Sequence, residues 1–147
     1  MKKIFTTLLL MLLLVGTAFA QRGLETRPVF QGKVVPKGQM VVTEARGGSM
    51  ATYKLSYFKS IKFQVNEELA KKVAALVSAD AAAAKSAETA KDGDFLTYAL
   101  IQTKPSGKTR RYLCYQARPA GPAWVVTILY LEGSATLEDL RSMFDKQ

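Results

Sequence analysis

The stretch over residues 95–131 most constrains the fold, because it predicts three consecutive β-strands. Residues 95–103 and 109–117 are rich in aromatic, β-branched and other apolar residues, and Pro105 and Gly107 lie between them. Proline presets φ for the second position of a turn, and glycine accepts the left-handed conformation that closes it. The two runs therefore predict a β-hairpin.

The third run, residues 124–131, follows a break at 118–122 that contains two prolines, which cannot donate to a β ladder. It shows no alternation of apolar and polar residues, which is typical of a strand covered on both faces. A buried helix is the alternative. The four consecutive β-branched residues from Val125 to Ile128 favour the strand.

Two further strands and a long helix are predicted before this stretch. Residues 40–45 read as one strand, and alternation over 53–65 predicts another with one wet face and a bend near Lys59. At Asn66 the period becomes helical, with Asn66 as the N-cap. We expect this helix to continue through the alanines to about Lys91.

The chain closes with a short predicted helix, in which Thr136 and Asp139 approximate a capping box. Together the segments predict a two-layer α+β domain over residues 39–147, with the order β-β-α-β-β-β-α and a mainly antiparallel sheet. We expect the long and the short helix to pack on the same face. Residues 21–38, with several glycines and prolines, are predicted to be an irregular lead-in with at most one short extended piece.

The N-terminus carries the pattern of an export signal. Lys2 and Lys3 precede an apolar run that includes residues 8–15, and residues 18–20 (Ala-Phe-Ala) resemble a signal-peptidase site. We expect cleavage before Gln21, a periplasmic or secreted location, and no membrane span in the mature chain. A membrane anchor is the alternative, but the apolar run is shorter than the about 20 residues that span a bilayer.

The chain is basic, with 21 basic and 12 acidic residues and a formal net charge of +9. Removing residues 1–20 removes two lysines and no acid, which leaves +7. A basic exported protein meets anionic envelope components such as lipid headgroups, lipopolysaccharide or acidic glycans. Nucleic acid is the usual partner of a basic domain, but it is not expected outside the cell. The alternative is that the charge only keeps the protein soluble.

The residue inventory excludes several kinds of chemistry. No histidine is present, which removes the commonest general base and every His-dependent triad. Cys114 is the single cysteine, so an intramolecular disulfide and a structural zinc site are excluded. We expect an inert buried thiol, with an intermolecular disulfide or a reactive thiol as the alternative. The adjacent acids at 67–68 and 138–139 lie at helix starts, where the dipole favours them. No cofactor and no metal is predicted.

The predicted hairpin supplies the candidate anion contacts. Lys104, Lys108 and Arg110, together with Arg111, place four cations around its tip, where they could hold a phosphate or a carboxylate. The alternative is a solvated tip that protects a strand edge from aggregation.

The same hairpin supplies a candidate interaction surface. If residues 105–107 form a three-residue loop, Lys104 pairs with Lys108, and the register divides the side chains between two faces. One face carries the more uniformly apolar set Leu96, Tyr98, Leu100, Tyr112 and Cys114, and we expect both helices to cover it. The other face mixes aromatic residues, threonines and an arginine, as interfaces do. The hypothesis is a recognition surface formed by Phe95, Ile101, Arg111 and Tyr115.

The order of elements, the Phe-Ala-Gln junction at residues 19–21, and Glu132-Gly133 followed by a short helix resemble the small exported proteins of unknown function of Bacteroidetes-type Gram-negative bacteria. That resemblance implies an envelope location and an α+β fold, and no activity.

We therefore expect an exported, non-enzymatic binding or interaction module that recognises an envelope protein or an anionic envelope component. The alternatives are an enzyme of unrecognised type that uses carboxylates and arginines, and a structural envelope component that self-associates, for example as a homodimer.

Overall fold

The computed structural model describes residues 23–105 and 108–145. The predicted signal peptide and part of the predicted hairpin loop lie outside these ranges. The six strands are β1 (Met40–Arg46), β2 (Leu55–Asn66), β3 (Ser86–Asp92), β4 (Phe95–Gln102), β5 (Arg110–Ala120) and β6 (Ala123–Gly133). The α-helices are α2 (Arg27–Phe30), α3 (Glu67–Ala82) and α4 (Leu137–Asp145), and two short 3-10 helices span Lys37–Gln39 and Gly48–Tyr53.

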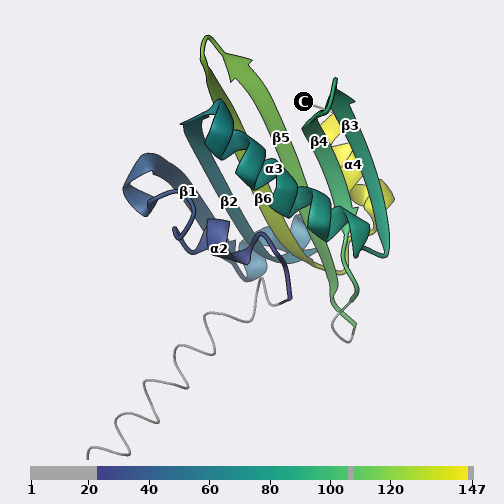
Figure 1. Ribbon diagram of the computed structural model, residues 1–147. Coiled ribbons are helices and arrows are strands. Elements are labelled where there is room, and N and C mark those ends of the chain that lie inside the picture. Colours follow the sequence, from purple (N-terminus) through teal and green to yellow (C-terminus); the bar gives the residue numbers. More distant parts are fainter. Residues whose placement is uncertain (1–22, 106–107, 146–147) are drawn as a thin grey trace, which may run out of the picture.

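The six strands form one antiparallel sheet in the order β1-β2-β6-β5-β4-β3 (Figure 1). β6 lies inside it and is apolar on both faces. Val126, Ile128 and Tyr130 belong to the core under α3, whereas Leu129 and Leu131 face the core under α4. The predicted α+β class is confirmed, and residues 124–131 form the predicted inner strand, although its second face is covered only at Leu129 and Leu131.

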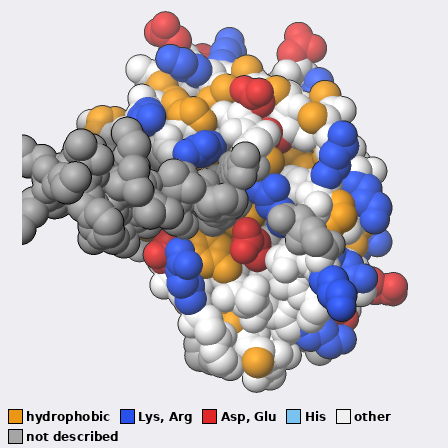
Figure 2. All heavy atoms as spheres, turned by 90° about the horizontal axis from the view of Figure 1, so that it is seen from below, with side chains coloured by type: hydrophobic (Ala, Val, Ile, Leu, Met, Phe, Trp, Pro, Cys, Tyr) orange, Lys and Arg blue, Asp and Glu red, His pale blue; other side chains and the backbone are white. Residues whose placement is uncertain are grey.

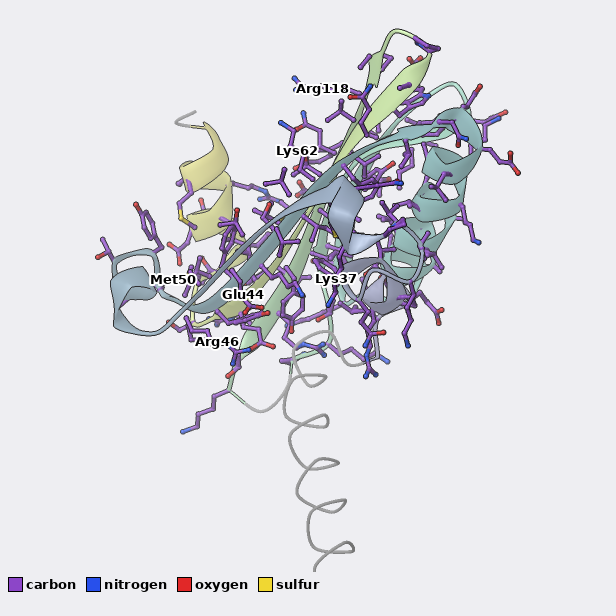
Figure 3. All side chains as sticks on the ribbon, turned by 90° about the vertical axis from the view of Figure 1, so that its left-hand side faces the viewer. Lys37, Glu44, Arg46, Met50, Lys62 and Arg118 are labelled. Atoms are coloured by element: carbon purple, nitrogen blue, oxygen red, sulfur yellow. The ribbon has the colours of Figure 1, made fainter. Side chains whose placement is uncertain are left out.

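The two helices lie on opposite faces of the sheet, not on one face as predicted (Figure 3). α3 begins at the end of β2, with its N-terminus capped by the Asn66 side chain, which accepts a hydrogen bond from the Leu69 amide at 2.9 Å. It packs against the apolar face of β2 that carries Ile61, Phe63 and Val65. α4 begins at the predicted capping box and packs with Tyr112 and Leu131 on the other side.

The long helix is shorter than predicted, because it ends at Ala82 and the chain then forms the edge strand β3. β3 pairs with β4 through a two-residue turn, Gly93-Asp94, between the paired residues Asp92 and Phe95. Gly93 has φ +61°, the left-handed conformation that a glycine-first hairpin turn requires. Helix propensity of the alanines is thus overridden by pairing with β4.

The predicted lead-in contributes to the core, although it was expected to be irregular. Residues 27–30 form one helical turn, and Val29, Phe30 and Val35 are fully buried beside α3. Asp80 of α3 fastens this segment: its carboxylate accepts hydrogen bonds from the Glu25 amide, the Thr26 amide and the Thr26 hydroxyl at 2.7, 3.1 and 2.8 Å. The N-terminal segment is therefore part of the domain.

Candidate functional site

The predicted recognition surface does not form, because α3 covers two of its four residues. Ile101 is 0% exposed and Tyr115 is 2% exposed. The Tyr115 hydroxyl donates a hydrogen bond to the Leu96 carbonyl at 2.8 Å, inside the core. β4 and β5 pair with Ile101 opposite Leu113, two residues away from the predicted register. An even shift keeps the division between faces from Tyr98 to Tyr115, although an irregularity where β3 pairs with β4 places Leu96 in the core under α3. The main error lies in which face receives α3.

The face that α3 covers was predicted wrongly because the prediction used the hairpin alone, without the strands β6 and β2 beside it. The register of β2, β6 and β5 places Ile61, Ile128 and Tyr115 in one row across the sheet. Since α3 continues directly from β2 and covers its apolar side, it also covers Tyr115.

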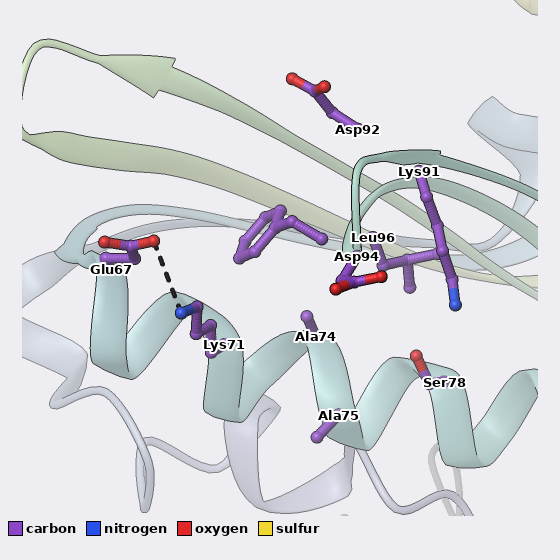
Figure 4. A pocket seen from close by; sticks show the side chains of 10 residues that line it. Glu67, Lys71, Ala74, Ala75, Ser78, Lys91, Asp92, Asp94 and Leu96 are labelled. Atoms are coloured by element: carbon purple, nitrogen blue, oxygen red, sulfur yellow. Dashed lines mark ion pairs between the residues drawn. The ribbon is translucent and has the colours of Figure 1, made fainter.

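Phe95, the third of these residues, lies beside a groove between α3 and the turn that joins β3 to β4 (Figure 4). The Phe95 ring stacks on Trp124 with 4.2 Å between ring centroids and 26° between planes. The groove has a volume of about 500 Å³ and is lined by Glu67, Lys71, Ala74, Ala75, Ser78, Lys91, Asp92, Asp94, Phe95 and Leu96.

The charges of this groove are all exposed. Glu67 and Lys71 form an ion pair at 3.5 Å in which each side chain is 64% exposed. The other charged lining residues, Lys91, Asp92 and Asp94, are also exposed. Exposed pairs of this kind contribute little free energy. Among the described lining residues, no charged group is buried where it could orient a ligand.

Carboxylates and arginines do meet on the face of the sheet that α3 covers. The Arg111 guanidinium donates to the Tyr130 hydroxyl at 2.8 Å, and that hydroxyl donates to Glu132. In the neighbouring strands, the Tyr57 hydroxyl donates to Glu44 at 2.7 Å. The Tyr57 and Tyr130 rings meet edge to face with 5.9 Å between centroids.

The polar groups of this network are hydrogen-bonded to one another. Burial raises the pKa of Tyr130 far above its usual range, so its hydroxyl stays a neutral donor. Glu44 and Glu132 each accept a hydrogen bond from a tyrosine. The network therefore joins β1, β2, β6 and β5, and it is where the alternative of a carboxylate enzyme would have to be tested. Among the described residues, no group of His, Cys, Asp and Glu side chains could hold a metal ion.

The cations of the predicted hairpin tip do not converge. Arg110 and Arg111 lie on opposite faces of β5, because Arg111 contacts Tyr130 whereas Arg110 donates to the Ser134 carbonyl at 2.5 Å. Lys104 and Lys108 are exposed. Figure 2, which looks onto this end from below, shows Lys and Arg side chains spread around the rim with Asp and Glu between them. The candidate anion contacts are therefore separate surface cations in the described structure.

A different group of residues emerges where α4 stops covering its face of the sheet. We call this region the open face. It consists of side chains from β2, β6, β5 and β4 that point to the same side of the sheet as α4 but lie outside the core under α4. The strand register shows that these are Lys62, Gln64, Tyr98, Gln116, Arg118, Val125 and Thr127.

Lys62 and Arg118 are the charged residues of the open face. Both are exposed, and neither forms an ion pair with a described residue. In Figure 3 both project from the sheet on the side where α4 lies. Tyr98 is 41% exposed. The sequence indicated the polar side of β2, but Tyr98 was expected under a helix, because the length of sheet that α4 covers cannot be read from periodicity.

Comparison with known proteins completes the description. Among the described residues, no helix is long and apolar enough to cross a membrane. Neither a curated protein nor a solved structure matches the chain. A family model described as a family of unknown function, DUF6108, matches residues 13–144. Because this match covers both cores and every strand of the sheet, the chain belongs to the DUF6108 family.

Proposed function

We propose that the protein is an exported, non-enzymatic binding module of the bacterial envelope and that its ligand or partner lies on the open face. The observation that carries this proposal is that Lys62 and Arg118 have no ion-pair partner among the described residues and lie on a part of the sheet that no described helix covers. Glu88, the acid on the same side of the sheet, is occupied by an ion pair with Arg141 of α4. The open face is therefore locally cationic and free to receive an acidic group.

The predicted export signal supports the envelope location, and the net charge supports an anionic counterpart. Charge distributed over a whole surface also attracts anions without any specific site. The experiment must therefore distinguish binding at the open face from attraction by the net charge of the whole protein.

The test is co-sedimentation of the purified protein with envelope fractions of the host. The double variant Lys62→Glu/Arg118→Glu should lose retention, because two attractive contacts become repulsive. The matched control is Lys33→Glu/Lys72→Glu, which makes the same change in net charge at exposed lysines away from the open face. The control should remain bound. Equal loss in both double variants would show that bulk charge alone acts, and retention of the first would remove the open face as the site.

A second candidate function, self-association, is favoured by one observation. Val41 and Val42 on the edge strand β1 are 68% and 45% exposed. An uncovered sheet edge with exposed apolar side chains can pair with another chain. If sedimentation shows a dimer that Val42→Lys dissociates, the edge of β1 is an interface between copies.

A further inference from the structure

The open face has a shape and a set of side chains that specify its ligand class more closely. We propose that the ligand is an acidic polysaccharide that lies across the strands, with acidic groups at Lys62 and Arg118 and a sugar ring on Tyr98. This inference rests on the proposed function and adds the chemistry of the ligand to it.

The first argument is the row that crosses the sheet. Lys62 of β2 lies opposite Thr127 of β6, Thr127 lies opposite Gln116 of β5, and Gln116 lies opposite Tyr98 of β4. Three strand spacings make this row about 14 Å long. An extended polymer can follow such a row, whereas one small ion would occupy only a part of it.

The second argument is the separation of the two cations. Arg118 lies two strands from Lys62 and two residues further along the sheet, because it shares a row with Val125 and Gln64. The two Cα atoms are thus about 12 Å apart. Side chains stand roughly perpendicular to a sheet, so the two cations can contact different acidic groups. A ligand that carries at least two acidic groups would use both.

The third argument is what lies between and beside the cations. Gln64, Gln116 and Thr127 offer amide and hydroxyl groups, which can both donate to and accept from sugar hydroxyls. At the end of the row, the partly exposed Tyr98 ring presents an apolar surface with a polar tip. Acidic, hydroxyl-bearing and ring-shaped parts occur together in a polymer of uronic acids.

The same composition disfavours the other anionic partners. Two cations near an anionic bilayer contribute about 1 kcal/mol each, and the exposed aliphatic side chain beside the row, Val41 opposite Lys62, is small. A protein interface is usually dominated by a few aromatic or arginine anchors set in an apolar surround, whereas the neighbours Tyr98 and Arg118 stand among amide and hydroxyl side chains.

The experiment measures binding of a polyuronate by calorimetry, with protein purified from cells that express the full chain. The comparison probes are a neutral polysaccharide of similar length, vesicles of anionic phospholipid, and inorganic phosphate. We expect binding to the polyuronate, weakened by salt because exposed charges are screened, and no saturable binding to the other probes. Lys62→Gln and Arg118→Gln should each lower the affinity by about tenfold, the loss of one charge-assisted contact.

Tyr98→Ala should also lower the affinity severalfold, whereas Tyr98→Phe should retain it, because the ring and not the hydroxyl makes the contact. Lys72→Gln on α3 is the control for net charge and should bind as the wild type does. Melting curves for each variant show that the fold is intact. Equal binding of the neutral polymer, equal loss in Lys72→Gln, or binding to vesicles alone would overturn the inference.

The two proposals fail separately. If Lys62→Glu/Arg118→Glu no longer co-sediments with the envelope fraction and the wild type does not bind the polyuronate, the open face is a binding site for another class of ligand. If that variant remains on the envelope, the proposed function and this inference are both wrong.

Discussion

At the residue scale, Gly133 marks a place where two backbones touch. A Cβ atom at this position would lie 2.3 Å from the Lys54 carbonyl oxygen and 2.7 Å from the Leu55 Cα. Both neighbours are backbone atoms beside a register shift in β2. A flexible side chain could move aside, but these atoms cannot move without shifting the strand. The sequence showed Glu132-Gly133 as a feature at the end of a strand and gave no sign of this contact.

We predict that Gly133→Ala destabilises the protein by about 1–3 kcal/mol, the usual cost of forcing extra volume into a packed site. The matched control is Gly38→Ala, where a Cβ would meet nothing within 4 Å and φ is not positive. The control should stay within about 0.5 kcal/mol of the wild type. Urea unfolding measures both. Equal stabilities of the two variants would show that the strands separate easily at this point.

Cys114 gives a prediction with a defined pH dependence. Burial raises the pKa of its thiol to about 12, whereas an unfolded thiol titrates near about 8.5. The neutral thiol is therefore favoured in the folded state. Its contribution to stability is complete below about pH 8.5 and is lost as the pH rises toward 12.

At pH 8 the native protein should accordingly react with a thiol reagent more than about a hundredfold more slowly than the denatured protein, because the thiolate is the reacting form. Stopped-flow labelling with and without denaturant measures the ratio, and Cys114→Ala supplies the blank. Fast labelling of the native protein would instead reveal an exposed thiol and reopen a redox role.

At the element scale, Asp80 connects α3 to the N-terminal segment. Its carboxylate is 4% exposed, and burial raises its pKa although three donors bind it. A raised carboxyl pKa means that burying the ionised form costs free energy. Stability from this group is complete below about pH 4 and is lost as the pH rises through the folded-state pKa. The three hydrogen bonds offset that cost, and two of them satisfy the buried amide and hydroxyl of Thr26.

We predict that Asp80→Ala lowers the free energy of unfolding by about 2 kcal/mol or more, because it leaves the buried Thr26 amide and hydroxyl without an acceptor. Hydrogen exchange should speed up in residues 24–35 before it does in the sheet. Glu68→Ala, an exposed acid on the same helix, is the control and should cost less than about 1 kcal/mol, the favourable dipole interaction, without faster exchange in residues 24–35. Unchanged protection of residues 24–35 would mean that apolar packing alone holds this segment.

At the scale of the whole molecule, the sequence predicted what depends on one element at a time. The Asn66 cap, the alternation of β2 and the two-sided apolar character of β6 each follow from local residue types, and the structure confirms them. The Gly93-Asp94 turn was also readable as a hairpin signal, but the surrounding alanines favoured a helix. What could not be read was the side on which a helix packs, because that depends on the register of strands far apart in sequence.

For the candidate site too, features that depend on one element were predictable, and features that depend on tertiary packing were not. The alternation over 53–65 correctly predicted a wet side of β2, and Lys62 lies on that side. Phe95 lines a groove that the hairpin alone did not indicate. Tyr115 was placed on the surface because nothing in the hairpin itself indicates that β2 brings α3 over it. The open face exists only where α4 ends, and the extent of that cover is a property of tertiary packing.

The central position of β6 also sets an order for the folding of this chain. Until residues 123–133 are present, β2 can pair only with β1, because its other neighbour in the sheet is β6. Pairs such as Ile61 with Ile128 close a loop of most of the domain, and contacts of such high sequence separation form slowly. During synthesis the first hundred or so residues therefore remain without the central strand of the sheet. The nascent chain should stay unfolded in this region, and accessible to chaperones, until nearly its whole length has emerged.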